Sequence, residues 1–288
     1  MYDGCVSPLN EVGYYFVFLQ STFAMLPSIM YPMNPIVLLN KPLSLTPLQM
    51  IKKLQILKPE YIGMKIGYAG RLDPMAEGLL LLLVGDENKH RKEYERLDKT
   101  YEFEVLLGLE TDSYDVLGLI QQDINATQLQ DVRKTVKSLL ETYIGTWEQP
   151  YPPYSAARVN GKPLYYWARE GKIDQITIPS KKITIHSIKL NNIFKVNLAD
   201  IYPEIVSRIQ TVEGEFRQKQ ILSCWKAVFT NNPDCKLIKL PCTVSCSSGT
   251  YVRSISHSIG TDLGVGGIAL SIKRTVVGPY TLQTAIHL

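Results

Sequence analysis

Histidine and cysteine, the residues that most often hold transition metals, are scarce in this chain of 288 residues, which has 4 His and 5 Cys. Cys242 and Cys246 lie four positions apart with no histidine nearby, so the ligand spacing of a zinc site is missing. A small and odd number of cysteines also excludes a disulfide-stapled scaffold and is typical of reduced thiols in a cytosolic protein. We therefore predict no metal site.

Several common fingerprints of enzyme sites are missing as well. The sequence has no GxxxxGK[ST] phosphate loop, no GxSxG elbow and no HExxH pair. A glycine-rich run at 264–267 follows an expected helix, whereas a dinucleotide-binding loop follows a strand. Any chemistry must therefore depend on carboxylates, tyrosines and arginines.

The composition that remains is that of a folded protein with a sizeable core. Hydrophobic residues make up 45% and charged residues 20%, which excludes a wholly disordered chain. We find no internal repeat, collagen pattern or sustained heptad. Lys and Arg number 31 against 27 Asp and Glu, a formal net charge of +4. This small excess permits a nucleic-acid partner without requiring one, because such a partner needs local basicity.

The N-terminal 33 residues differ from the rest of the chain. Residues 12–33 carry no charge and are rich in aromatics, but Gln20, Ser21, Thr22 and Pro27 interrupt them, and no Lys or Arg precedes them as in a signal peptide. We interpret 1–33 as an extension that is not translated, with the natural start near Met33; a membrane anchor is the alternative. One domain is expected over 34–288, with an insertion of little hydrophobic pattern at about 195–235.

Hydrophobic periodicity places strands and helices along 34–288. Thr46 and Pro47 form a helix start of the N-cap and first-turn proline type. The run 79–84 is apolar throughout, as in a strand buried on both faces. Further expected strands are 36–39, 101–107, 183–188 and 243–247, and further expected helices are 129–143 and 252–263. Because the elements do not alternate strictly, we predict an α+β fold.

One segment is organised around a carboxylate. Residues 67–78 read GYAGRLDPMAEG and lead directly into the apolar strand. Two glycines before Asp73 and a proline after it hold that side chain in a rigid loop, which the buried strand fixes to the core. Such a loop preorganises a side chain for chemistry, although the same pattern is compatible with an aspartate that only caps a turn.

This segment resembles the central motif of the TruB family of pseudouridine synthases, GHxGxLDPxAxGxLxxxxGxATK. Other stretches of the chain are similar to further motifs of that family, and they occur in the family's order. These stretches are 40–42 (NKP), 99–115 (from KTY to TDSYD), 154–171 (from YSA to AREG), 246–254 (CSSGTYVRS) and 273–278 (KRTVVG). The resemblance covers roughly 34–280, except for 195–235. It implies a pseudouridine synthase fold with a mixed, mainly antiparallel central sheet flanked by helices and loops.

The resemblance also implies an activity and a set of catalytic residues. Family members detach a uracil base from its ribose within RNA, turn it and rejoin it through carbon; bond count and redox state are unchanged, so no cofactor is needed. Asp73 matches the essential aspartate and Arg253 the arginine paired with it. A buried carboxylate needs such a cation to stay ionised. Tyr101 matches the tyrosine that stacks on the target base and helps to remove its C5 proton.

The remaining matches imply contacts with the substrate. Tyr251 and Ile272 correspond to pocket positions, and Lys41 to the lysine of the opening motif. Asp115 matches a family aspartate, although it could simply cap a turn. Tyr68 stands where the family has a histidine that stacks on RNA; a tyrosine ring can stack too, so we expect activity to survive.

Two other features depart from the pattern of many family members. Glu77 stands where a threonine is frequent, which would place an anion near the site. The chain ends at Leu288, which leaves no room for the C-terminal RNA-binding PUA domain of many members. We therefore expect the catalytic domain alone to grip tRNA, and the guide-RNA-dependent branch of the family is disfavoured.

From the resemblance we expect a cytoplasmic, monomeric isomerase that forms pseudouridine at position 55 in the T-arm stem-loop of tRNA. It would need no small-molecule cofactor and no obligate protein partner. Two alternatives remain. One is a tRNA-refolding chaperone with weak catalysis, and the other is a pseudouridine synthase that acts on another RNA such as rRNA.

Overall fold

A ten-stranded sheet forms the centre of the computed structural model, which describes residues 34–122, 132–232 and 234–288. The main path of the sheet runs β1-β3-β13-β4-β12-β10-β7, while β2, β11 and β14 pair with β3, β12 and β13. All pairings are antiparallel except that of β3 with β13. The strands of this sheet are β1 (Ile36–Lys41), β2 (Ile66–Ala69), β3 (Ala76–Val84), β4 (Lys99–Leu107), β7 (Gly145–Pro150), β10 (Ser180–Leu190), β11 (Phe194–Asn197), β12 (Lys236–Cys246), β13 (Gly267–Val277) and β14 (Tyr280–Thr281).

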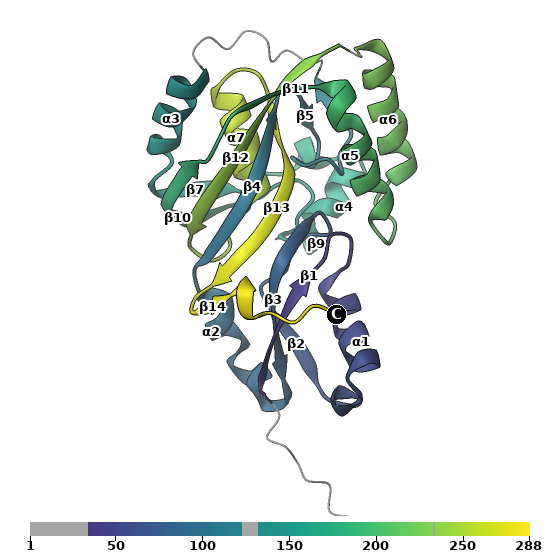
Figure 1. Cartoon of the computed structure of the whole chain (residues 1–288), viewed down its shortest axis with the longest axis vertical. Coiled ribbons are helices and arrows are strands. Elements are labelled where there is room, and N and C mark those ends of the chain that lie inside the picture. Colours follow the sequence, from purple (N-terminus) through teal and green to yellow (C-terminus); the bar gives the residue numbers. More distant parts are fainter. Residues whose placement is uncertain (1–33, 123–131, 233) are drawn as a thin grey trace, which may run out of the picture. The chain divides into compact units, whose positions relative to one another are not determined.

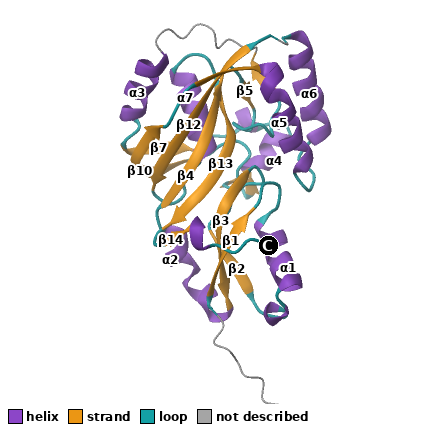
Figure 2. Cartoon of the chain, in the orientation of Figure 1, coloured by secondary structure: helices purple, strands orange, loops and turns teal. Residues whose placement is uncertain are grey.

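Helices and two small hairpins flank this sheet (Figures 1 and 2). Figure 1 shows α1 and α2 near β1, β2 and β3, with α5 and α6 side by side near β11. The helices are α1 (Pro47–Leu57), α2 (Arg91–Arg96), α3 (Val132–Thr142), α4 (Leu164–Arg169), α5 (Leu198–Thr211), α6 (Gln218–Asn231) and α7 (Val252–Asp262). The hairpins pair β5 (Glu110–Thr111) with β6 (Ile120–Gln122) and β8 (Arg158–Val159) with β9 (Lys162–Pro163). The α+β prediction and the mainly antiparallel sheet are thus confirmed.

Local sequence signals account for the elements around the Asp73 loop. Thr46 caps α1, where its hydroxyl accepts from the Gln49 backbone N–H and the Gln49 side chain accepts from the Thr46 N–H, a capping box. In β3, residues 79–84 are all buried, and the strand pairs with β1 along one edge and with β2 and β13 along the other. Both predictions from the sequence are confirmed.

Regular structure also occurs where the sequence did not predict it. Residues 195–235, expected to show little pattern, contain α5 and α6. The prediction that this segment is an insertion stays a prediction. The long strand β13 was not predicted at all, although it lies between β3 and β4 in the sheet. The first residues of the helix expected over 129–143 lie outside the described residues.

The α5–α6 hairpin, defined here as residues 198–231, packs on the sheet through a continuous apolar core. Ile205 and Trp225 from the hairpin are fully buried with Leu106 of β4 and Ile268 of β13. The segment 109–117, which follows β4, joins the same cluster. The hairpin is therefore an integral part of the domain core. No helix in the described part of the chain is long and apolar enough to span a membrane; the membrane-anchor alternative concerns 1–33, outside the described residues.

Candidate active site

A cavity of about 890 Å³ opens where the Asp73 loop, the segment after β4 and the start of α7 meet. Seven of the eight residues implied by the resemblance line this cavity, and five of them are Tyr68, Asp73, Tyr101, Asp115 and Tyr251. Arg253 and Ile272 line it as well, whereas Lys41 does not. Tyr68 and Ile272, which lie 204 positions apart in the sequence, thus face one space.

Asp73 lies in the connection between β2 and β3. Gly70 begins this loop with φ of 76°, a left-handed conformation that glycine adopts without steric cost. The loop is closed by the Ala76 N–H, which donates to the Asp73 carbonyl at 3.0 Å, and it is tied to the chain before α1 by the Ser44 N–H, which donates to the Pro74 carbonyl at 3.0 Å. The carboxylate itself is 35% exposed and faces the cavity.

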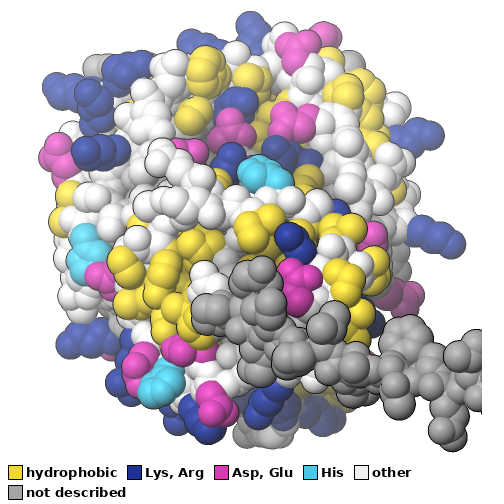
Figure 3. Space-filling model, turned by 60° about the horizontal axis from the view of Figure 1, so that its bottom comes forward, with side chains coloured by type: hydrophobic (Ala, Val, Ile, Leu, Met, Phe, Trp, Pro, Cys, Tyr) yellow, Lys and Arg dark blue, Asp and Glu magenta, His cyan; other side chains and the backbone are white. Residues whose placement is uncertain are grey.

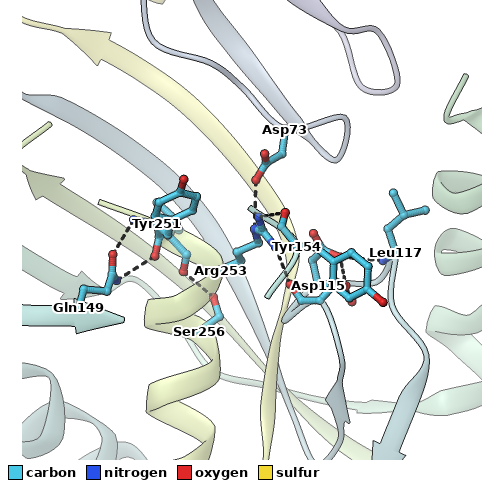
Figure 4. A network of polar contacts seen from close by, with 10 residues as sticks. Asp73, Asp115, Leu117, Gln149, Tyr154, Tyr251, Arg253 and Ser256 are labelled. Carbon is cyan, nitrogen blue, oxygen red and sulfur yellow. Dashed lines mark hydrogen bonds and ion pairs between the residues drawn. The ribbon is translucent and has the colours of Figure 1, made fainter. Parts of the chain in front are cut away.

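Arg253, the second residue of α7, pairs with this carboxylate (Figure 4). Its Nε donates to Asp73 Oδ2 at 3.1 Å, and its two terminal nitrogens donate to the carbonyls of Ser113 and Tyr154, each at 2.9 Å. Burial opposes the charge, but the carboxylates of Asp73 and Asp115 outweigh it and raise the pKa of Arg253. The guanidinium thus stays charged and fixed in orientation, which is what an ionised carboxylate at the cavity wall requires.

Two tyrosines and an isoleucine form the less polar part of the wall. Tyr101 on β4 is 9% exposed; burial raises the pKa of its hydroxyl, and the nearby Arg274 acts in the opposite direction. Tyr251 is held through its backbone, which exchanges two hydrogen bonds with the Gln149 side chain at 2.8 and 3.1 Å. Ile272 on β13 pairs with Phe103 of β4. Rings and an aliphatic side chain around a carboxylate suit a planar base.

Asp115 and Tyr68 also reach the cavity, with different surroundings. The Asp115 carboxylate accepts from the Ser113 hydroxyl at 2.6 Å and from the Leu117 N–H at 2.9 Å, so it caps its own turn as well as lining the wall. Burial raises the pKa of Asp115, although Arg253 and these donors oppose the shift. Tyr68 presents its ring near the Arg91 guanidinium, 5.3 Å from the ring centre.

Lys41 lies outside the cavity lining, so the structure gives no support to the expectation that it contacts substrate. Lys41 is 0% exposed, and its ammonium donates to the carbonyls of Pro42 at 2.9 Å and Leu45 at 2.7 Å. Burial lowers its pKa to about 8, with Asp73 and Glu77 opposing the shift. Because two of its three N–H donors bond backbone carbonyls and the side chain is buried, Lys41 supports the chain before α1. Glu77 does not line the cavity either; it borders a smaller hollow next to Lys273.

Three cationic residues of the wall were not singled out as site residues from the sequence. Lys99 donates to the carbonyls of Glu95 and Leu97, and burial lowers its pKa to about 8. Arg274 is 1% exposed and donates to the carbonyls of Leu79 at 2.8 Å and Gly70 at 3.2 Å. Arg217 comes from the α5–α6 hairpin. Lys99 and Arg274 lie inside stretches that resemble the family, a signal that could have identified them; Arg217 has no such signal.

No cluster of three or more His, Cys, Asp or Glu side chains suited to a metal ion occurs in 34–122, 132–232 and 234–288. The four cysteines of these ranges, Cys224, Cys235, Cys242 and Cys246, are unpaired.

The fold and this cavity define the class of protein when they are compared with known proteins. The family model "TruB family pseudouridylate synthase (N terminal domain)" matches residues 55–214. A solved structure, the crystal structure of a Cbf5-Nop10-Gar1 complex, superposes with a TM-score of 0.52 at 17% identity, covering 88% of this chain and 52% of that one. The present chain thus spans about half the length of that solved chain, and the likeness shows the shared fold.

Curated relatives are similar over most of the sequence. The tRNA pseudouridine synthase B of Bacillus licheniformis is 33% identical over 254 residues, which are 88% of this chain and 68% of that protein. The protein of the same name from Francisella tularensis is 30% identical over 257 residues, 89% of this chain and 69% of that protein. The chain belongs to the TruB family of pseudouridylate synthases.

Proposed function

We propose that this chain isomerises uridine to pseudouridine in tRNA, at position 55 of the T arm. One observation carries the proposal: the ion pair of Asp73 with Arg253 opens into a cavity walled by Tyr101, Tyr251 and Ile272. The relatives named tRNA pseudouridine synthase B support tRNA as the substrate.

The chemistry follows from what the cavity offers. A uridine inside a stem-loop must leave its stack before any side chain reaches its glycosidic bond, and the cavity provides aromatic faces for the extruded base. Asp73 then acts as an ionised carboxylate next to the ribose and base, with Arg253 holding its charge and direction. Isomerisation transfers no electrons and leaves the bond count unchanged, so these residues need no redox partner.

We expect the cations at the cavity rim to bind the RNA backbone. Lys92, Arg96, Arg71, Lys181 and Arg169 line or border the cavity. On the face shown in Figure 3, Lys and Arg are interspersed with Asp and Glu. Phosphates should therefore bind at the rim, and binding should weaken with salt because counterions are released. We further propose that the enzyme acts as a monomer in the cytoplasm, without an obligate partner.

The test uses a T-arm hairpin and a full-length tRNA transcript that carry [5-³H]uridine. Isomerisation releases the C5 label to water, and carbodiimide mapping locates the product. We expect label release and a product at position 55, and none when that uridine is replaced by cytidine. RNA binding without product would favour the tRNA-refolding chaperone. Product only in an rRNA fragment would favour a pseudouridine synthase that acts on rRNA. Either result contradicts the proposal.

A further inference from the structure

The α5–α6 hairpin contributes one arginine to the cavity wall. Arg217 lies just before α6, and its side chain is 19% exposed. Its backbone has φ of 64° and ψ of 24°, in the left-handed region that residues other than glycine rarely adopt. Such a conformation persists where surrounding contacts over-determine it, and it is frequent at functional sites. The contacts of the Arg217 side chain account for this backbone conformation.

Arg217 forms a closed cluster with Asp112 and Tyr154. Its terminal nitrogens donate to the two Asp112 carboxylate oxygens at 2.7 and 3.2 Å, a bidentate pair. The Tyr154 hydroxyl donates to Asp112 Oδ2 at 3.0 Å, and the Arg217 guanidinium lies 4.3 Å from the Tyr154 ring centre. Charge pairing, a hydrogen bond and a cation–π contact therefore fix three side chains against one another.

This cluster adjoins both backbone groups that orient Arg253. The Tyr154 carbonyl accepts from one terminal nitrogen of Arg253, and the carbonyl of Ser113, next to Asp112, accepts from the other. The hairpin also holds the same segment from behind, where the Trp225 indole N–H donates to the Val116 carbonyl at 3.3 Å. Displacement of Tyr154 or of the segment around Asp112 would thus turn Arg253 away from Asp73.

We propose that Arg217 is a positioning residue: by clamping Asp112 and Tyr154, it holds the two carbonyls that aim Arg253 at Asp73. The inference rests on the proposed function for its kinetic consequence and on the contacts above for its structural one. A direct role in binding an RNA phosphate is disfavoured, because the Asp112 carboxylate already engages both terminal nitrogens of the guanidinium.

The kinetic test compares Arg217→Gln and Asp112→Asn with Arg208→Gln. Arg208 is a matched control: it belongs to the same hairpin, is also 19% exposed and pairs with Glu204 at 2.8 Å, but it does not line the cavity. We expect both cluster variants to lower kcat by between about 10- and 100-fold, since small misplacements of reacting groups have such effects. KM for the T-arm hairpin should stay within about three-fold, and the double variant should be no worse than either single one. Arg208→Gln should match wild type.

A second measurement is independent of activity and therefore separates failure of this inference from failure of the proposed function. In protein labelled with ¹⁵N-arginine, the Nε–H of Arg253, assigned by its loss in Arg253→Lys, should exchange slowly with solvent because it is bonded to Asp73. We expect faster exchange in Arg217→Gln and Asp112→Asn but not in Arg208→Gln. Unchanged exchange in folded cluster variants would overturn the inference, even if wild type proved inactive.

An increase in KM with kcat intact, together with a salt dependence of binding reduced by about one unit of log–log slope, would also overturn it, since that pattern marks a phosphate contact. If Arg217→Gln fails to fold, Arg217→Lys keeps the charge and removes the bidentate geometry, and the same two readouts apply.

Discussion

Arg253 and Lys41 are both buried cations beside the Asp73 loop, and their partners differ. Arg253 shares its donors between two carbonyls and the carboxylate of Asp73, which is 35% exposed toward the cavity. The Lys41 ammonium donates to the carbonyls of Pro42 and Leu45, and its side chain is fully buried. One cation faces a group that can react, whereas the other faces the backbone.

The partners of these two cations distinguish a residue that takes part in the reaction from a residue that stabilises the fold. Both cations are implied by motifs, so the motif alone does not distinguish them. A buried charge bound by carbonyls keeps a loop in place but offers nothing to a ligand. Lys41 therefore holds the loop before α1, whose Ser44 N–H donates to the Pro74 carbonyl at 3.0 Å.

The largest loss of turnover should come from Asp73, the partner of Arg253. Asp73→Asn keeps the shape of the side chain but removes its charge, so turnover of the T-arm hairpin should fall by at least about 10³-fold. RNA affinity should remain within a few-fold, because the carboxylate contributes little to gripping phosphates. Label release from [5-³H]uridine and a filter-binding assay measure the two quantities. Turnover above about a hundredth of wild type would remove Asp73 from the chemistry.

A substitution of Tyr101, which lines the same cavity as Asp73, should have a smaller effect on the rate. Tyr101→Phe keeps the ring for stacking and removes the hydroxyl, which burial keeps in its neutral form by raising its pKa. If that hydroxyl assists in removing the C5 proton, single-turnover rates should fall by about 100-fold while binding is unchanged. A rate equal to that of wild type would restrict Tyr101 to stacking.

On the structural side, Lys41→Met should change how stability depends on pH. The pKa of Lys41 is lowered to about 8 by burial, from 10.5. Between these values the unfolded chain binds more protons, so wild type should gain stability relative to Lys41→Met as the pH rises from 8 to 10.5, by on the order of 1–3 kcal/mol. Urea unfolding at several pH values measures this, with the exposed Lys52→Met as control. Parallel curves for Lys41→Met and wild type would contradict the burial argument.

Tyr68 provides the smallest expected effect, at the rim of the cavity. Tyr68→Ala removes a stacking face and should weaken T-arm binding by about ten-fold. Tyr68→His restores the usual family residue and should stay within a few-fold of wild type in both binding and turnover. A large loss in Tyr68→His would show that the phenol ring, with its neighbour Arg91, has become specific to this chain.

The sequence was sufficient where local chemistry decides structure. The Thr46 capping box marks α1, and the uninterrupted apolar run 79–84 marks β3, so both could be located without tertiary information. The ordered motifs also imply that Asp73 pairs with Arg253, and the structure gives them an Nε–Oδ2 distance of 3.1 Å. Their catalytic roles remain proposals.

Other features depend on contacts that sequence periodicity does not show. β13 begins in a glycine-rich stretch that indicates a turn, yet β4 and β3 pair with it and make it a central strand. In the α5–α6 hairpin, α5 contains Pro203 and α6 begins without a side-chain cap, so the usual start and continuation signals are absent. The role of Lys41 could not be assigned from its motif, because only the fold shows that its ammonium donates to backbone carbonyls.

The most direct test measures turnover and stability together for Arg253→Ala and Lys41→Met. We expect opposite effects in the two variants. Arg253→Ala should fold and bind the T-arm hairpin but lose at least about 100-fold in single-turnover rate, because Asp73 loses its cation. At pH 10, Lys41→Met should unfold at a lower urea concentration than wild type, while its folded fraction keeps a single-turnover rate within a few-fold of wild type. Equal losses of rate in both variants, at equal folded fraction and RNA saturation, would contradict the separation of reaction and fold on which the account depends.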